Sequence, residues 1–415
     1  MARLVLKFGG TSVADPERIR RVAGHVRREV EAGHEVAVVV SAMAGETDRL
    51  VGLAHAAAKD HQGLLDAREY DAIVATGECV TAGQLALTLQ DMGLSARSWS
   101  GWQIPVLTSN VHGAARIQRI DTRLLEERLA QGQIPVITGF QGLADDNRVT
   151  TLGRGGSDTS AVAIAAALRA DRCDIYTDVD GVYTTDPRMV PRARKIERIA
   201  FEEMLEMASL GAKVLQTRSV ELAKTQGVRV QVLTSFADPA APIAGTLVCD
   251  EDEIVEHLAV SGIAYSRNEA KVTLVRVKDR PGVSGRIFRL LADAGINVDM
   301  IVQAVSVDGL STDMTFTVAR DKLVRARDLL ERARAEVAYE TLVADQGVAK
   351  VSVIGVGMRS HEGVAARMFE TLGKRGINIQ AISTSEIKIS VLIEDSHTQE
   401  AVQALHTAFG LDTDG

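Results

Sequence analysis

The second half of the chain contains an internal repeat. The stretch RPGVSGRIFRLLADAGINVDMI (280–301) aligns without a gap to HEGVAARMFETLGKRGINIQAI (361–382). Each copy is preceded by a strand-like stretch, AKVTLVRV or AKVSVIGV, and is followed by another, MTFTV or IKISVLI. This is a β-α-β-β pattern used twice. Two copies this similar predict two related small domains that pack on each other.

The first half of the chain alternates between apolar strands and helices. Asp15 and Pro16 are typical of a helix start, and Ile19, Val22 and Val26 follow at helical spacing. Continuous apolar strands that alternate with helices indicate a mostly parallel sheet covered on both faces. We therefore expect an α/β fold in which helices sandwich a mostly parallel sheet, followed by the two β-α-β-β domains. The predicted strands are 3–8, 35–40, 133–139, 171–177 and 229–233, and the predicted helices are 15–33, 46–58 and 69–92.

The composition changes around residues 235–255, where proline, alanine and acidic residues accumulate. At 415 residues the chain is too long for one ordinary core. We expect a catalytic domain at 1–245, a first regulatory domain at 265–340 and a second at 345–415.

Charge and cysteine usage limit the possible classes of protein. Lys and Arg number 47 against 55 Asp and Glu, a net charge of −8, which argues against a nucleic-acid partner. Three cysteines lie far apart without a CxxC pair, as is typical of a reducing compartment. We find no secretory segment and no continuous apolar run of membrane-spanning length. The sequence predicts a cytoplasmic protein without a membrane partner.

Two glycine-rich stretches are candidate anion sites, although neither is a P-loop or a GxGxxG motif. In KFGGTS, Gly9 and Gly10 expose backbone N–H groups beside the cation of Lys7, which favours a phosphate. The alternative is a strand-to-helix turn with a surface lysine.

The second stretch, TTLGRGGSDTSAVAIAAAL, has glycines and an arginine at the start of a helix. The fork of Arg154 suits a carboxylate, and Ser157 can cap the helix, whose N-terminus favours an anion. The acid Asp158 would repel a phosphate, so it is consistent with an anion site only if it pairs with lysines or binds a metal. The alternative is a glycine turn with a capping Ser-Asp pair.

Three further positions carry weaker signals. The loop YTDVDGVYTTDPR (176–188) could hold a nucleotide base and a metal-bound phosphate, or it could be a series of surface turns. Glu78 falls in an apolar helix, where a buried carboxylate needs a partner such as a substrate ammonium; a capping or ion-paired glutamate is the alternative. Lys213 lies on a predicted helix, where lysines are mostly solvated.

Taken together, these stretches resemble the aspartate kinases of the amino acid kinase superfamily. The resemblance covers essentially the whole chain and rests on KFGGTS, SAM, TGE, TTLGRGGSDT, DVDGVYTTDPR, GAKVL and ISTSEIKISVLI in this order, with repeats that resemble ACT domains. Some branches of the family have His-Pro where this chain has Gln216-Thr217. The resemblance implies phosphorylation of the β-carboxylate of L-aspartate by ATP with Mg²⁺. It also implies inhibition by an end-product amino acid, lysine or threonine, and homo- or hetero-oligomers formed through the ACT-like domains.

The resemblance implies roles for individual residues. The phosphoryl oxygens are expected to contact Lys7, Lys213 and the N–H groups of Gly9 and Gly10, with Asp158 orienting the lysines. The magnesium is expected to be carried by ATP, without protein ligands. The residues expected to bind aspartate are Ser41, Thr47, Glu78, Arg154, Gly155, Gly156 and Ser157. Those expected to frame the nucleotide are Thr177, Asp178, Tyr183, Asp186 and Arg188.

The effector is expected at the paired repeats. The motif KDRPGV opens a helix whose free N–H groups can bind an amino acid carboxylate, while Asp279 can bind its ammonium. Because Ser360 replaces Asp279 in the second copy, we expect the first repeat to dominate. The expected effector residues are Asp279, Gly282, Val283, Asn297 and Gln303 in the first repeat, with Val364, Ala365 and Asn378 from the facing one.

Two alternatives are open at this stage. Acetylglutamate, glutamate, carbamate and uridylate kinases of the same superfamily share the phosphate-binding logic. A protein of a different class, an amino acid sensor without catalysis, would retain only the repeats. Intact Lys7 and Asp158 argue against the sensor.

Overall fold

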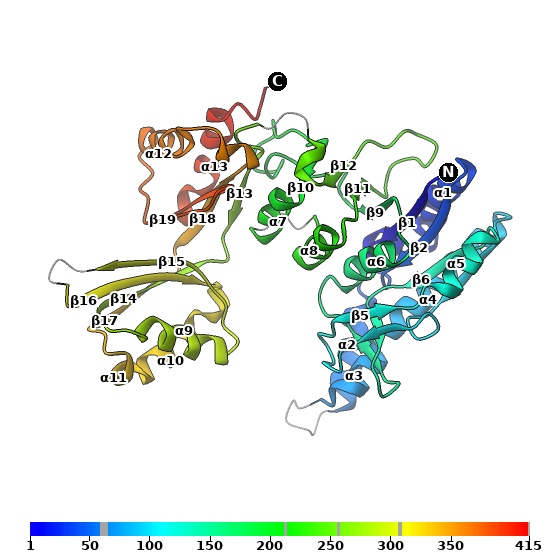
Figure 1. Ribbon diagram of the computed structural model, residues 1–415, viewed down its shortest axis with the longest axis horizontal. Coiled ribbons are helices and arrows are strands. Elements are labelled where there is room, and N and C mark those ends of the chain that lie inside the picture. The colour runs from blue at the N-terminus through cyan, green and yellow to red at the C-terminus, as the bar shows by residue number, and fades with distance from the viewer. Residues whose placement is uncertain (59–64, 211–213, 255–257, 306–308, 414–415) are drawn as a thin grey trace. The chain divides into compact units, whose positions relative to one another are not determined.

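The computed structural model describes residues 1–58, 65–210, 214–254, 258–305 and 309–413 (Figure 1). The chain divides into two compact units, which are described separately. The first unit comprises Met1–Val182, Lys195–Ala208 and Lys213–Val255, and the second comprises Tyr183–Arg194, Ser209–Ala212 and Glu256–Gly415.

The first unit is built on an eight-stranded sheet with the order β10-β12-β11-β9-β1-β2-β6-β3. All neighbouring strands are parallel except β11 and β12, which are antiparallel. The predicted mostly parallel sheet is therefore confirmed. Its strands are β1 (Arg3–Phe8), β2 (Glu35–Val40), β3 (Ala96–Trp99), β6 (Ile134–Thr138), β9 (Arg172–Thr177), β10 (Arg198–Ala200), β11 (Val230–Thr234) and β12 (Thr246–Cys249).

Helices cover both faces of this sheet. Successive side chains along β1 point alternately to one face and to the other. Leu4, Leu6 and Phe8 join a core with α1 and α4, whereas Val5 and Lys7 point to the opposite face, where α6 packs on β1. The helix α1 begins as predicted, with the Asp15 side chain accepting from the Arg18 N–H. The helices are α1 (Pro16–Glu31), α2 (Glu46–Ala57), α3 (Ala67–Val74), α4 (Thr76–Asp91), α5 (Arg123–Ala130), α6 (Gly156–Ala167), α7 (Phe201–Ser209) and α8 (Thr217–Gln226).

The region predicted as one helix, 69–92, forms two helices, α3 and α4, which meet at Ala75. By length and composition alone, Ala67–Asp91 is apolar enough to cross a membrane. Half of its apolar window is buried inside the fold, and Asp71 and Glu78 are buried within it. Helices that pack into a protein core have the same composition.

A second sheet in the first unit was not predicted from the sequence. Its order is β5-β4-β7-β8, and its strands are too short to give a clear periodic pattern. They are β4 (Val106–Thr108), β5 (Ile117–Ile120), β7 (Gln141–Leu143) and β8 (Val149–Thr151).

The second unit contains the two repeats, each a four-stranded antiparallel sheet that buries apolar side chains against its helices. The first sheet has the order β15-β16-β14-β17 and the second the order β13-β18-β20-β19. The first repeat contains β14 (Ala270–Lys278), α9 (Val283–Asp293), β15 (Val298–Val305), β16 (Ser311–Val318), α10 (Leu323–Arg332), α11 (Arg334–Val337) and β17 (Thr341–Asp345). The second contains β13 (Gly262–Ser266), β18 (Val348–Ile354), α12 (Val364–Lys374), β19 (Ala381–Thr384), β20 (Lys388–Glu394) and α13 (Thr398–Ala408).

The two repeats contact each other through β15 and β19. The Lys350 side chain of the second repeat is 5% exposed, and its Nζ lies 2.5 Å from Asp299 Oδ2 and 3.0 Å from Glu269 Oε1. A buried cation with two carboxylate partners thus joins the repeats.

The second repeat is not contiguous in sequence. Its edge strand β13 precedes the first repeat and pairs with β18. The segment Tyr183–Arg194 also belongs to this unit: the Ile263 N–H donates to the Thr184 carbonyl at 2.7 Å, and Val190 lies in the core of the second repeat. Pairing between segments this distant in sequence leaves no local signal.

Candidate active site

The parallel strands of the first unit end at one edge of the sheet. Ligands of open α/β sheets bind in the crevice beyond these carboxyl ends. Backbone hydrogen bonds join the loops that follow the strands: Ser41 N to Phe8 O at 3.1 Å, and Gly9 N to Tyr176 O at 3.3 Å. The loops with the predicted phosphate and aspartate residues therefore begin side by side.

Lys7 and Asp158 form an ion pair at this edge, with Lys7 Nζ 2.5 Å from Asp158 Oδ1. Each residue is 8% exposed. Lys7 comes from β1 and Asp158 from the first turn of α6, which packs on the same face of the sheet. A Cβ added to Gly9 would lie 3.4 Å from Lys7 Nζ, so the ammonium lies beside bare backbone.

The start of α6 depends on its glycines. Gly155 is the N-cap residue with φ +70°, and an added Cβ there would lie 2.2 Å from Gln216 Cγ at the start of α8. A Cβ on Gly156 would lie 2.8 Å from the Phe140 ring. Protein side chains therefore pack closely on both glycines, whereas the predicted approach of a substrate to this backbone stays a prediction.

Arg154 precedes these glycines. Its side chain is exposed and makes no hydrogen bond or ion pair with any residue that the structure describes. An unpaired guanidinium beside a helix N-terminus can bind a carboxylate with both of its nitrogens. The adjoining Ser157 packs against Gly139, where an added Cβ would lie 2.9 Å from the Ser157 hydroxyl oxygen.

Glu78 is buried, with 3% of its surface exposed. Its Oε1 accepts a hydrogen bond from the Ala42 N–H at 3.1 Å, whereas its Oε2 is buried without a partner among the described residues. Burial raises the pKa of this carboxyl to about 7, against the opposing effect of the Ala42 N–H. The unpartnered oxygen is suited to an added cation.

Ser41 and Thr47 flank the same loop. Ser41 follows β2 directly and Thr47 lies in the first turn of α2; both are half-buried. Gly77 packs on this loop so closely that an added Cβ would lie 2.8 Å from Ala42 Cβ. The structure therefore brings the 41–47 loop against the start of α4, where Glu78 lies.

The predicted nucleotide residues fall into two groups. Thr177 and Asp178 lie at the carboxyl end of β9, and the Thr177 hydroxyl donates to Asp178 Oδ1 at 3.2 Å. Tyr183, Asp186 and Arg188 lie in the second unit. There the Asp186 carboxylate pairs with Arg188 at 2.8 Å, which lowers its pKa. Lys213 lies outside the described residues, and all these nucleotide roles stay predictions.

The expected effector residues lie in the second unit. Gly282, with φ +89°, caps α9, and Val283 is buried in its first turn. The Ser284 hydroxyl donates to Gln303 Oε1 at 3.3 Å, so β15 brings Gln303 to the start of α9 as expected. Asp279 and Asn297 are exposed. In the second repeat, Asn378 is exposed, and Val364 and Ala365 line a surface pocket.

Sequence analysis did not identify the residues that hold the carboxyl end of β9 at this edge of the sheet. The Ser235 N–H and hydroxyl both donate to the Thr177 carbonyl, at 2.9 and 3.1 Å, and the buried His25 ring lies 3.3 Å from the Ser235 carbonyl. Burial lowers the pKa of His25 to about 4, so the ring is neutral. No sequence signal marks these residues, because their contacts join distant segments.

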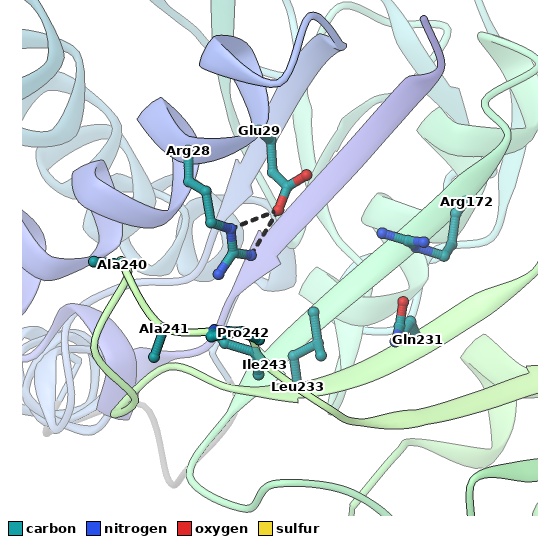
Figure 2. Close-up of a pocket in the computed structure, with 9 residues that line it drawn as sticks. All are labelled: Arg28, Glu29, Arg172, Gln231, Leu233, Ala240, Ala241, Pro242 and Ile243. Atoms are coloured by element: carbon teal, nitrogen blue, oxygen red, sulfur yellow. Dashed lines mark hydrogen bonds and ion pairs between the residues drawn. The ribbon is translucent and has the colours of Figure 1, made fainter.

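A cavity of about 530 Å³ lies apart from the predicted residues (Figure 2). It is lined by Arg28 and Glu29 of α1, by Arg172 and Gln231 of two strands, and by the loop 240–243. Arg28 pairs with Glu29 at 2.6 Å. None of its lining residues was predicted to bind a ligand. Among the residues that the structure describes, no group of three or more His, Cys, Asp or Glu is placed to hold a metal ion.

Comparisons with known proteins agree with this arrangement. Residues 2–234 match the amino acid kinase family, and residues 271–335 and 351–409 each match an ACT domain. The chain is 52% identical over 413 residues to an aspartate kinase from Pseudomonas fluorescens (strain SBW25), covering 99% of this chain and 98% of that protein. It is similar to the crystal structure of E. coli aspartokinase III in complex with aspartate and ADP, with a TM-score of 0.80, 29% identity and coverage of 98% and 99%. The same aspartokinase in complex with lysine and aspartate gives a TM-score of 0.77 and 28% identity over the same shares of the two chains. The chain therefore belongs to the aspartate kinases of the amino acid kinase family.

Proposed function

We propose that this aspartate kinase transfers the γ-phosphoryl group of ATP to the β-carboxylate of L-aspartate, through the residues at the carboxyl edge of its main sheet. The products are 4-phospho-L-aspartate and ADP. One observation carries the assignment: among the residues that the structure describes, a buried carboxylate oxygen of Glu78 in the first turn of α4 has no partner, and Arg154 in the loop before α6 is unpaired. An amino acid substrate supplies an ammonium for Glu78 and a carboxylate for Arg154.

The acceptor carboxylate is ionised at neutral pH, with a reference pKa of about 3.9, so that no general base is needed. The difficulty is the approach of one anion to another. Catalysis then depends on positioning and on positive charge around the transferring group. Lys7 supplies such a charge from β1, and the N–H group of Gly10 adjoins it, whereas the Gly9 N–H donates to the Tyr176 carbonyl.

Asp158 holds the Lys7 ammonium at the edge of the sheet before the nucleotide binds. Its own negative charge is offset by that lysine, which reduces repulsion toward a phosphate. Lys213 is assigned to the same oxygens by resemblance alone. Mg²⁺ accompanies ATP and neutralises part of the phosphate charge.

The remaining residues are assigned by their places in the loops. Glu78 binds the substrate ammonium, Arg154 its α-carboxylate, and Ser41, Thr47 and Ser157 supply hydroxyl contacts, with Gly155 and Gly156 allowing close approach. Thr177 and Asp178 contact the nucleotide. We also propose that the protein works in the cytoplasm and that its ACT domains bind lysine or threonine; E. coli aspartokinase III has been seen with lysine.

The test is release of ADP by the full chain with L-aspartate, compared with L-glutamate and N-acetyl-L-glutamate. We expect turnover with L-aspartate alone. Turnover with one of the other acids instead would assign a different substrate, and absence of turnover with all three would favour the sensor without catalysis.

The site assignment has its own test. The variant Arg154→Lys retains the charge but loses the bidentate fork, so KM for aspartate should rise far more than KM for ATP. An equal rise of both constants, or a rise for ATP alone, would contradict a carboxylate clamp.

A further inference from the structure

Arg218 joins the chain segment that carries Arg154, the candidate aspartate clamp, to a second segment at Ala115. It lies in the first turn of α8, beside α6 (Figure 1). Its two terminal nitrogens donate to the Leu152 carbonyl and to the Ala115 carbonyl, both at 2.8 Å. Leu152 is only two positions before Arg154, so this guanidinium fixes the backbone from which the exposed Arg154 side chain projects.

The charge of Arg218 is not neutralised by an acid. It forms no ion pair with any residue in the described part of the chain, and its partners are neutral carbonyls. Burial and then the neighbouring charge of Arg116 lower its pKa. A half-buried guanidinium normally has a carboxylate partner, because desolvation of a charge is costly.

Asp71 holds the same two segments from the side of α3. Its fully buried carboxylate accepts from the Thr151 N–H at 3.0 Å, from the Thr151 hydroxyl at 2.6 Å and from the Gly113 N–H at 3.0 Å. Directly after these contacts, Gly153 has φ +77°, and an added Cβ would lie 3.0 Å from the Gly113 carbonyl. Two charged side chains from different helices thus fix the two residues that precede Gly153, Thr151 and Leu152.

We propose that Arg218 is a positioning residue for the aspartate site: it fixes the loop of Arg154 so that the guanidinium of Arg154 meets the α-carboxylate of the substrate. Asp71 assists through its hydrogen bonds to Thr151 and Gly113. This inference rests on the proposed function, because it takes Arg154 as the carboxylate clamp. Arg218 acts through Arg154 and does not itself contact the substrate.

The experiment compares steady-state kinetics of Arg218→Gln, Arg218→Lys and a matched control, Arg116→Gln, in the full chain. Arg116 is exposed beside Ala115, and its side chain forms no hydrogen bond or ion pair with any described residue, so the control removes one nearby charge without removing a hydrogen bond. We expect Arg218→Gln to raise KM for aspartate by roughly ten- to a hundredfold, as for loss of hydrogen bonds from a charged group. KM for ATP should change by less than about twofold.

Arg218→Lys separates charge from geometry. Lysine keeps the charge but cannot bind both carbonyls with a planar fork, so we expect an intermediate rise in KM for aspartate. Arg116→Gln should change it by less than about twofold. Equal values of KM for aspartate in Arg218→Gln and Arg116→Gln would overturn the proposal. If Arg218→Gln does not fold, Arg218→Lys decides, and a KM for aspartate at the wild-type value would overturn it.

A double-mutant cycle with Arg154→Ala tests whether Arg218 acts through Arg154. If it does, Arg218→Gln should have little further effect on KM for aspartate once Arg154 is absent, because coupled residues are not additive. Full additivity would overturn the positioning role. Arg154→Ala also separates the two proposals. If it leaves KM for aspartate unchanged, the assignment of Arg154 as the carboxylate clamp is wrong. If Arg154→Ala raises KM for aspartate but Arg218→Gln does not, only the inference about Arg218 is wrong.

Discussion

The ammonium of Lys7 lies 2.5 Å from the carboxylate of Asp158, and both residues are 8% exposed. The pair joins the end of β1 to the first turn of α6, the two elements whose glycines adjoin the candidate site. A buried pair of this kind has a high cost when one member is lost, because the other is left as an uncompensated charge. The site therefore contains a preformed cation whose position does not depend on the nucleotide.

Lys7→Ala should reduce kcat by at least about 10² to 10³-fold, the loss expected when a preorganised charge at the transferring group is removed. The measurement is ADP release, with folding checked by circular dichroism. Lys224→Ala is the matched control, since Lys224 forms an exposed ion pair with Glu202 at 2.9 Å on the surface of the same unit. It should leave kcat within about twofold. A folded Lys7→Ala variant with near-normal turnover would rule out the assignment.

The pKa of Glu78, raised by burial to about 7, predicts a pH dependence of aspartate binding. Below this pKa the carboxyl is protonated and attracts an ammonium weakly; above it the carboxylate is present. Because kcat/KM reports groups of the free enzyme, kcat/KM for aspartate should rise with pH and level off above about 7. Profiles from pH 5.5 to 8.5 check this, at about quarter-unit steps around the expected pKa. The inflection should disappear in Glu78→Gln, and its persistence there would assign it to another group.

The same raised pKa predicts a cost in folding stability. The folded protein binds the Glu78 proton more tightly than the unfolded chain does, so the bound proton stabilises the fold. This stabilisation is fully present below the unfolded pKa of 4.5 and is lost as pH rises through about 7. A shift of this size corresponds to about 3 kcal/mol in the free energy of unfolding. Glu78→Gln should therefore gain stability relative to the wild type as pH rises from about 4.5 to 8, measured by urea unfolding. A stability difference that does not vary with pH would show that the buried carboxyl titrates normally.

The sequence pattern predicted those parts of the fold that depend on residues close together in the sequence. The strand β1 and the capped start of α1 at Asp15 and Pro16 occur where the sequence placed them. The break between α3 and α4 at Ala75 could not be predicted, because no proline and no capping side chain marks it. The place of Tyr183–Arg194 in the second unit could not be predicted either, because it depends on pairing with β13 and on the packing of Val190.

The candidate site shows the same division. The residue types at Lys7, Glu78 and Arg154 indicated their chemistry, because glycine-rich loops and an acid in an apolar helix are locally unusual. The residues that hold them, Arg218 and Asp71, could not be identified, because each contacts backbone far away in sequence. A helical arginine and a helical aspartate are ordinary surface residues until the fold is known.

Gly155→Ala should lower the free energy of unfolding by more than the backbone strain of a non-glycine residue at positive φ. A non-glycine residue at positive φ costs about 1–2 kcal/mol, and at this position the new Cβ would also lie 2.2 Å from Gln216 Cγ. Gly93→Ala is the matched control, with φ +81° and nothing within 4 Å of the added Cβ. Urea unfolding should show the larger loss for Gly155→Ala, and Gln216→Ala in the same chain should recover part of it. Equal losses in the two glycine variants would mean that the contact with Gln216 relaxes without cost.

The last prediction concerns regulation. Gly282 caps α9, and Gln303 accepts from Ser284 in the first turn of that helix. An amino acid effector can place its carboxylate at this helix start and its ammonium near Asp279. Inhibition requires that the effector bind an inactive arrangement more tightly than the active one, typically by about 1–3 kcal/mol. We expect lysine or threonine to act through this first repeat.

The double variant Asp279→Ala with Gln303→Ala should lose inhibition while its uninhibited kcat stays near the wild-type value. The internal repeat supplies a matched control, because Ser360 and Thr384 occupy the corresponding positions of the second copy. Ser360→Ala with Thr384→Ala should retain inhibition, since the two copies differ in the residue that would bind an ammonium. ADP release is measured against lysine and threonine, singly and together. Unchanged inhibition in the first double variant, or loss of effector binding in Arg154→Ala, would show that this helix start is not the sensor.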